Sequence, residues 1–263
     1  SSDVRRVIPR INWQSGTKYE MYKNNYSSTN RTSQSSNSGL YGSNYYVLTS
    51  EFKVYLCINN GSDPENDKGK VSKFEPTHTS TTVPAADNTA TGDGYQWKYL
   101  YTIAPADIVK FVTTAYIPLP EKWGDVSTKT IKDAAVDGKL ETIVIKRRGT
   151  ATVDGVDGDI SGIPIIGDGT GGTATATITN GVVSEIKLSN TNSSEYTYAH
   201  VRFVNGTWGG KKLVVGTLTD EPQFEVIIPP KGGHGGDIYR ELGAFRVMVY
   251  SKFDNNINDK TDY

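Results

Sequence analysis

The chain has 263 residues, which is enough for one large domain or two small ones. Its formal net charge is −1, so no basic field predicts nucleic-acid binding, and no apolar run is long enough to span a bilayer. Cys57 is the only cysteine, which excludes an internal disulfide framework and a cysteine-rich metal site. We expect it to be a small buried hydrophobe within a strand.

The first elements in chain order are an extended segment and a long polar loop. Residues 4–13 contain Pro9, which favours extended or turn-like backbone before it. Residues 24–42 are rich in Ser, Asn and Thr, with Tyr26 and Tyr41 among their few large side chains. We expect this run to be an exposed loop that becomes ordered against a partner.

Two strand patterns form the predicted centre of the fold. Residues 45–58 alternate apolar side chains before an Asn-Asn-Gly turn, and residues 95–103 carry an aromatic or aliphatic side chain at every second position. We expect the two segments to pair as an antiparallel sheet. Trp97 and Tyr99 are then buried between two layers, together with Phe52 or Val54. The alternative is an exposed aromatic platform that stacks sugars.

Short helices and a proline-limited segment follow the aromatic strand. Residues 104–111 predict a short helix with proline near its first position, and residues 116–120 predict an extended piece. Residues 127–136 predict a second short helix, capped by Ser127 and stopped near Gly138.

The composition changes at about Lys139 and stays rich in Gly, Thr and Val to about Ile228. Two alternating runs, 173–179 and 182–188, flank Asn180-Gly181. This dipeptide is a strong hairpin signal because both turn residues need positive φ. We interpret residues 139–228 as a small β-domain inserted into the first domain.

The chain then returns through the Gly-rich segment 229–236 to the main domain. Asp237 is suited to cap a short helix that Gly243 ends. Residues 245–253 predict the last strand, with Val247 and Val249 on one face together with Ser251 and Phe253.

The predicted fold is mainly β. It has a two-layer, sandwich-like main domain with long loops and a few short helices, at residues 1–138 and 229–263. The Gly/Thr-rich β-domain at residues 139–228 interrupts it.

Several local patterns resemble chemical sites without their full signature. The Gly-rich run 167–172 lacks a Gly-Lys-Ser/Thr ending and a following helix, so a plain turn is favoured over a phosphate loop. Asp154, Asp157 and Asp159 lack the spacing of a calcium loop. The three histidines have no ligand spacing, and His234 is interpreted as an exposed residue of the Gly-rich loop rather than a catalytic base. We predict no catalytic residue, no metal and no cofactor.

Five segments together carry the resemblance to phage proteins. Val-Ile-Pro-Arg at 7–10 with Trp13, and Gly-Asp-Gly-Tyr-x-Trp-x-Tyr-Leu at 92–100, resemble the baseplate wedge subunit encoded by gene eight of T-even-type contractile-tailed phages. Residues 116–120 and 232–244 are similar to its cyanophage branch. Residues 167–198 are similar to a Gly/Thr-rich β-module found in many phage structural proteins.

The resemblance implies a non-enzymatic structural protein of the virion, located in the tail baseplate and assembled in the host cytoplasm. It implies a homodimer that contacts other baseplate wedge proteins, with neither nucleic acid nor membrane as partner. Members of that family carry further residues before the Val-Ile-Pro-Arg motif and after the last strand, so we expect this chain to be a fragment or an incompletely represented chain. The inserted β-domain is absent from the T-even branch.

The candidate partner-contact residues are large side chains in the loops and in the insert. They are Tyr26, Tyr41, Trp208, His234 and Tyr239. Tyrosines suit this role because they supply amphipathic contact area at a small entropic cost. The alternative function is a carbohydrate- or receptor-binding module of a phage tail, with Trp208 as its stacking ring and a cap over the insert core as the simpler role of that residue.

Overall fold

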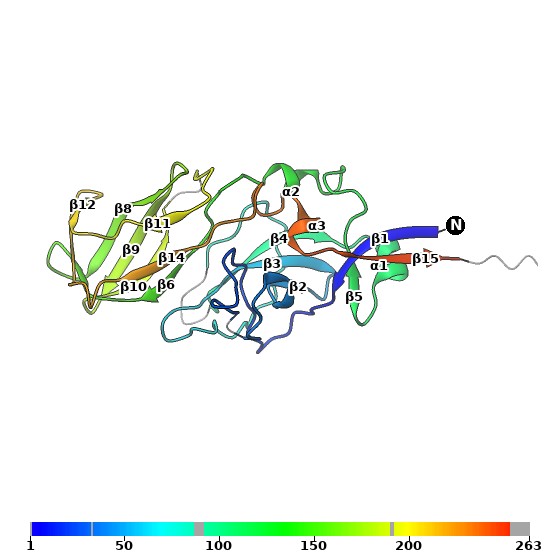
Figure 1. Cartoon of the computed structure of the whole chain (residues 1–263), viewed down its shortest axis with the longest axis horizontal. Coiled ribbons are helices and arrows are strands. Elements are labelled where there is room, and N and C mark those ends of the chain that lie inside the picture. The colour runs from blue at the N-terminus through cyan, green and yellow to red at the C-terminus, as the bar shows by residue number, and fades with distance from the viewer. Residues whose placement is uncertain (1, 33, 87–91, 190–191, 253–263) are drawn as a thin grey trace, which may run out of the picture.

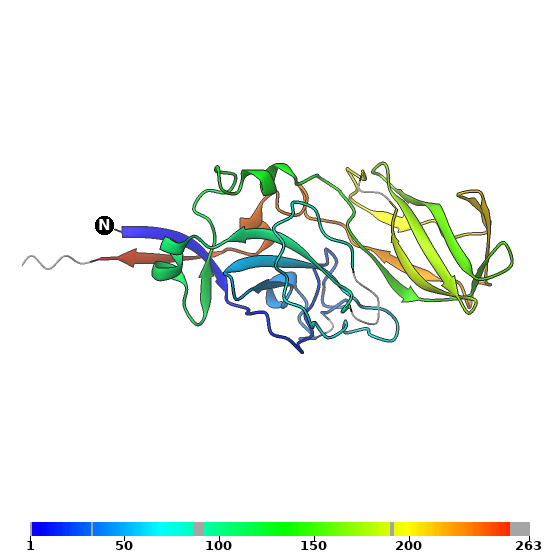
Figure 2. The ribbon, with the colours of Figure 1, turned by 180° about the vertical axis from the view of Figure 1, so that it is seen from behind.

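The computed structural model describes residues 2–32, 34–86, 92–189 and 192–252. The described chain is mainly β, as predicted, with antiparallel sheets and a few short helices. We call residues 2–138 and 229–252 the body and residues 139–228 the insert, following the division predicted from the sequence, which remains a prediction. Figures 1 and 2 show the insert at one end of an elongated molecule, with β1 and β15 at the opposite end.

The central sheet of the body has the order β2-β3-β4, with β2 at Tyr46–Leu48, β3 at Lys53–Asn60 and β4 at Tyr95–Thr102. The predicted antiparallel pairing of β3 with β4 is confirmed. The segment predicted as one strand at 45–58 is instead a hairpin. Its tight turn places Phe52 at a φ of 57°. A phenylalanine rarely adopts a positive φ, so the residue type did not indicate a turn at this position.

The aromatic face of β4 is mostly buried. Tyr95, Trp97 and Tyr101 are at most 6% exposed, whereas Tyr99 is only half-buried. The register shifts twice along the β3–β4 pair, so strict alternation fails and Leu100 and Lys98 are buried as well. Three of the four rings of β4 therefore pack inside the protein and are not available as a sugar-stacking platform.

A second sheet of the body joins the first and the last described strands. Its order is β15-β1-β5, with β1 at Ser2–Pro9, β5 at Tyr116–Pro118 and β15 at Arg246–Ser251. Helix α1, at Pro105–Phe111 as predicted, covers one face of β1 and β15. The other end of the predicted last strand, at Phe253, lies outside the described residues.

Strands account for most of the regular structure of the insert. A four-stranded sheet has the order β10-β9-β8-β11, with β8 at Gly158–Gly167, β9 at Thr173–Thr179, β10 at Val182–Leu188 and β11 at Ala199–Val201. A second sheet is ordered β12-β13-β7, with β7 at Ala151–Val153, β12 at Gly206–Trp208 and β13 at Lys211–Val215. The predicted hairpin is confirmed, and Asn180 and Gly181 both have positive φ, 54° and 72°.

A two-stranded ribbon connects the insert to the body. It pairs β6, at Ile143–Arg147, with β14, at Gln223–Val226. Val144 and the neighbouring Ile227 belong to the hydrophobic cluster of the body, whereas Ile143, Ile145 and Val226 belong to that of the insert. Because successive side chains of a strand point to opposite faces, each face of the ribbon contributes to a different core.

The remaining helices are short. They are η1 at Leu40–Gly42, α2 at Lys129–Asp133 and α3 at Ile238–Glu241. Asp237 caps α3 by accepting hydrogen bonds from two backbone amides, and Gly243 follows at a φ of 63°, both as predicted. The predicted cap of α2 is wrong: its N-cap is Thr128, and Ser127 donates instead to Asp125.

Candidate assembly surface

Exposed apolar side chains gather on the face of β1 and β15 that α1 leaves uncovered. Val4 is 49% exposed, and it pairs across the sheet with Val249, which is 59% exposed; Val247, on the same face, is 65% exposed. We call these three valines the valine face. A cluster of exposed apolar side chains of this kind is typical of a protein–protein contact.

On the opposite face of the same two strands, the charged and aromatic side chains find their partners in α1. Arg5 makes an ion pair of 3.1 Å with Asp107 of α1 and lies over the ring of Phe111. Lys110 contacts Asp3 at 2.5 Å and lies over Tyr250. Hydrogen bonding with Lys110 lowers the pKa of Asp3. Helix α1 therefore fixes the strands from one side and leaves the valine face open.

The outer edge of β15 is a second feature of this surface. Within the described ranges β15 pairs with β1 and with no other strand, so its outer backbone groups have no partner strand. It runs for six residues without a proline, and such an edge is a template for pairing with another strand.

Two predicted contact residues, Tyr41 and Tyr239, lie near α3, close to the start of β15. The hydroxyl of Tyr41 donates to the carbonyl of Arg240 at 2.8 Å, and its ring meets Phe245, which is 72% exposed, edge to face. The guanidinium of Arg6 lies 5.3 Å from the centre of the Tyr239 ring. The structure thus places both tyrosines at α3, Tyr239 within the helix and Tyr41 against it, although they are 198 residues apart in the chain.

Tyr26 and Trp208 lie away from this surface. Tyr26 is half-buried, and its hydroxyl donates to the carbonyl of Met21 at 3.1 Å; burial raises its pKa. Trp208 is half-exposed in the insert, where its ring lies under Arg202 and packs against the insert core. The partner roles of all five predicted residues remain predictions.

The expectation that His234 is exposed is wrong. Its side chain is 4% exposed, and its Nδ1 lies 2.5 Å from Oε1 of Glu241, which is itself buried. Three residues of the surrounding loop, Gly232, Gly233 and Gly235, have positive φ, so the backbone turns tightly enough to bring the imidazole inside. The sequence gives no signal for this, because Glu241 is only one of many acidic residues.

The polar loop 24–42 is exposed over much of its length, but it is attached to the body. The buried carboxylate of Glu20 accepts hydrogen bonds from the backbone amides of Gln34 and Ser35 and from that of Asn44. These hydrogen bonds hold the loop against the body within the chain itself, without a partner protein.

The patterns that resembled chemical sites have structural roles. Asp157 accepts from the amides of Asn180 and Gly181 at the hairpin tip. Asp168 accepts from the hydroxyl and the amide of Thr197, which lowers the pKa of Asp168 to about 2. Among the described residues no group of three or more His, Cys, Asp or Glu side chains could hold a metal ion. In that same part of the chain, no helix is long and apolar enough to cross a membrane.

The contact between body and insert is partly open. Cavities of about 300, 570 and 340 Å³ lie along it, and the first is lined by Asn59 and Gln96 of the body and by Ile143 and Ile186 of the insert. Polar contacts cross it beside these spaces, among them the ion pair between Arg148 and Glu65 at 2.5 Å.

The described chain is thus a β-rich protein with an open edge strand and an uncovered apolar face. Residues 68–156 match the model of a phage protein family described as Bacteriophage T4, Gp8. The matched segment contains the quoted motif at 92–100, so the resemblance to the family is confirmed over the matched residues. The match supports a structural component of a phage baseplate, and the cyanophage branch remains a prediction. Neither the curated proteins nor the solved structures gave a match.

Proposed function

We propose that this chain is a non-enzymatic component of a phage contractile-tail baseplate wedge, which forms a homodimer and contacts other wedge proteins. The family match over residues 68–156 supports the baseplate, and the open end of the β15-β1-β5 sheet supports assembly. The net charge of −1 gives little long-range steering, so association rests on shape and burial. Assembly places the chain in the virion, after synthesis in the host cytoplasm.

The homodimer forms by antiparallel pairing of β15 with β15 of a second copy, about a two-fold axis normal to the sheet. Directly opposed residues must then lie on the same face of the sheet. The axis therefore lies between the two copies of one residue, which pair with each other, and not at the level of the peptide bond between two successive residues. An axis at Met248 places Val247 opposite the partner's Val249. An axis at Val249 would instead place Arg246 opposite the partner's Lys252, and like charges directly opposite each other are destabilising. The Met248 register is therefore favoured over the Val249 register.

Cysteine cross-linking tests this register. Met248→Cys should form a covalent dimer under mild oxidation, because residue 248 faces its own copy. Val247→Cys and Val249→Cys should each remain monomeric on a denaturing gel, but a mixture of the two should cross-link. Cys57 does not compete because it is fully buried. Val109→Cys on α1, at a position 86% exposed, controls for random collision.

The valine face then becomes one strip across both copies, and this strip is the proposed contact for a neighbouring wedge protein. Val4→Lys should leave the dimer mass unchanged, because Val4 lies on β1 and not at the edge, but it should weaken co-purification with wedge proteins at least tenfold. Val109→Lys is the matched control, because Val109 lies on α1, on the side of the sheet opposite the valine face. A monomer at micromolar concentration would refute the dimer, and unchanged co-purification by Val4→Lys would refute the contact.

A further inference from the structure

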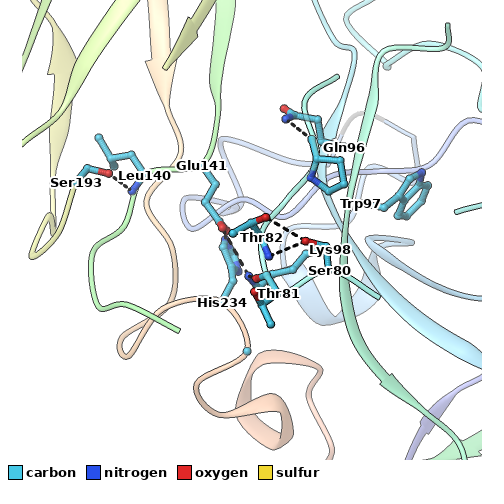
Figure 3. A network of polar contacts seen from close by, with 12 residues as sticks. Ser80, Thr81, Thr82, Gln96, Trp97, Lys98, Leu140, Glu141, Ser193 and His234 are labelled. Atoms are coloured by element: carbon cyan, nitrogen blue, oxygen red, sulfur yellow. Dashed lines mark hydrogen bonds and ion pairs between the residues drawn. The ribbon is translucent and has the colours of Figure 1, made fainter. Parts of the chain in front are cut away.

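Four ionisable side chains are buried together where the insert joins the body. They come from four segments: Lys98 from β4, Glu141 from the segment before β6, His234 from the Gly-rich loop, and Glu241 from α3. Each side chain is at most 9% exposed. We call them the buried ion cluster. Figure 3 shows Glu141 reaching toward both Lys98 and His234.

The distances make Glu141 and His234 the link between the two chain segments that cross between body and insert. Oε1 of Glu141 lies 3.6 Å from Nζ of Lys98, and its Oε2 lies 4.0 Å from Nε2 of His234. On the other side of the imidazole, Nδ1 lies 2.5 Å from Oε1 of Glu241, whose Oε2 accepts from the amide of Gly235 at 2.8 Å. The ring thus lies between two carboxylates.

With a neutral imidazole, the buried ion cluster has one hydrogen-bond donor too few. If its single proton is on Nδ1, facing Glu241, then Nε2 is an acceptor that faces Oε2 of Glu141, another acceptor. That oxygen is buried and has no hydrogen-bond partner among the described residues. A second proton, on Nε2, converts the repulsive contact into an attractive one.

The charge count leads to the same protonation state. With two carboxylates and one ammonium, the cluster carries −1 when His234 is neutral and zero when it is an imidazolium. An uncompensated buried charge is strongly destabilising. The other ionisable groups nearby do not alter this count: burial raises the pKa values of Tyr22 and Tyr45, which stay neutral, and Arg240 is exposed. The ring of Tyr22 packs edge-on against the imidazole at 4.6 Å.

We propose that His234 carries a proton in the folded protein and that this proton holds the two crossing segments together, so that the junction loosens when the proton is lost at higher pH. The cavities beside the junction give the loosened segments space to move. This inference rests on the buried ion cluster and is independent of the proposed baseplate role.

The sign of the pH dependence follows from proton counting. If the closed junction binds one more proton than the open junction, the closed state loses stability as the pH rises, by at most about tenfold in the equilibrium constant per pH unit. A merely structural hydrogen bond from a neutral imidazole would give no such slope.

Charge-neutralising variants of the full chain test the proposal. Glu141→Gln leaves the cluster neutral with a neutral imidazole, so the closed junction should then gain stability as the pH rises, reversing the slope. His234→Gln should abolish the contribution of this cluster to the pH dependence of the closed junction. The readout is hydrogen exchange of the amides at residues 139–142 and 233–236 between pH 6 and 8.5, corrected for the intrinsic rate. His200→Gln, at an exposed histidine, is the control and should keep the wild-type slope.

Two outcomes would overturn the proposal. One is a wild-type slope in Glu141→Gln or in His234→Gln. The other does not require any variant to fold: nitrogen NMR of the wild-type imidazoles at pH 7 should show both nitrogens of His234 protonated, and a neutral-ring signature would show that the cluster closes without the second proton.

Discussion

Trp97 is the residue whose replacement tests the packing of the body most directly. Its side chain is 5% exposed, stacks on Tyr95 at 5.3 Å and meets Tyr19 edge to face at 5.6 Å. Truncating such a ring to alanine removes its transfer free energy and leaves a cavity, at a cost on the order of 3–5 kcal/mol. We therefore expect Trp97→Ala to lower the free energy of unfolding by this amount.

The indole nitrogen of Trp97 makes the phenylalanine variant informative. Its Nε1 is buried and has no hydrogen-bond partner in the described chain, which reduces the net contribution of the ring by about 1–3 kcal/mol. Trp97→Phe keeps an aromatic ring, removes the unpaired donor and leaves a smaller cavity than alanine does, so it should cost less than Trp97→Ala.

Trp123 provides a matched control. It is 7% exposed, but its Nε1 donates to the carbonyl of Gly235 at 2.8 Å. Trp123→Phe should therefore cost about 1–3 kcal/mol more than Trp97→Phe, because it leaves a buried carbonyl without its donor. Denaturant unfolding of the three variants measures these differences. Equal costs for the two phenylalanine variants, or a loss below about 1 kcal/mol in Trp97→Ala, would refute this account of the packing.

Three further predictions concern the insert. Gly181→Val should lower the free energy of unfolding by about 1–2 kcal/mol, measured by thermal unfolding. The cost comes from backbone strain alone, because a Cβ at this position meets no atom within 4 Å. An unchanged melting temperature would contradict the positive φ of this turn. Asp168→Asn should reduce stability above about pH 4, and the difference from wild type should shrink as the pH falls from 4 through about 2, since the folded-state pKa is lowered to about 2 from 3.8; a difference that stays constant between pH 4 and pH 2 would exclude the carboxylate as its source. Residues 139–228 expressed alone should give a folded β spectrum, and replacing Val144 and Ile227 by threonine should raise the solubility of this piece; a disordered spectrum would show that it depends on the body.

The features that could be predicted from sequence are those set by neighbours along the chain. The hairpin at Asn180-Gly181 and the helix after Asp237 each depend on a few adjacent residues that have few alternatives. The strand β4 was predictable because its alternation spans eight residues, although its register shifts were not.

The features that the sequence did not reveal depend on residues far apart. Lys98 occupies an alternate, polar position in the aromatic strand, and only the fold shows that Glu141 meets it inside the protein. The burial of His234 depends in the same way on Glu241 and on Tyr22. Val247 and Val249 were predicted to lie on one side of the last strand, but alternation alone does not tell which side of a strand is covered. Helix α1 decides this, by packing on the opposite side.

The pairing of β1 with β15 has a consequence for the order of events during synthesis. Ser2 lies opposite Ser251, so β1 leaves the ribosome long before its partner strand exists. Until then β1 can pair only with β5, which follows about a hundred residues later. At typical translation rates of about 5–20 residues per second, the interval before β15 emerges is on the order of 10–50 s. During that time the edge of β1 is open to other nascent chains, and the charges of Asp3, Arg5 and Arg6 are suited to limit such pairing.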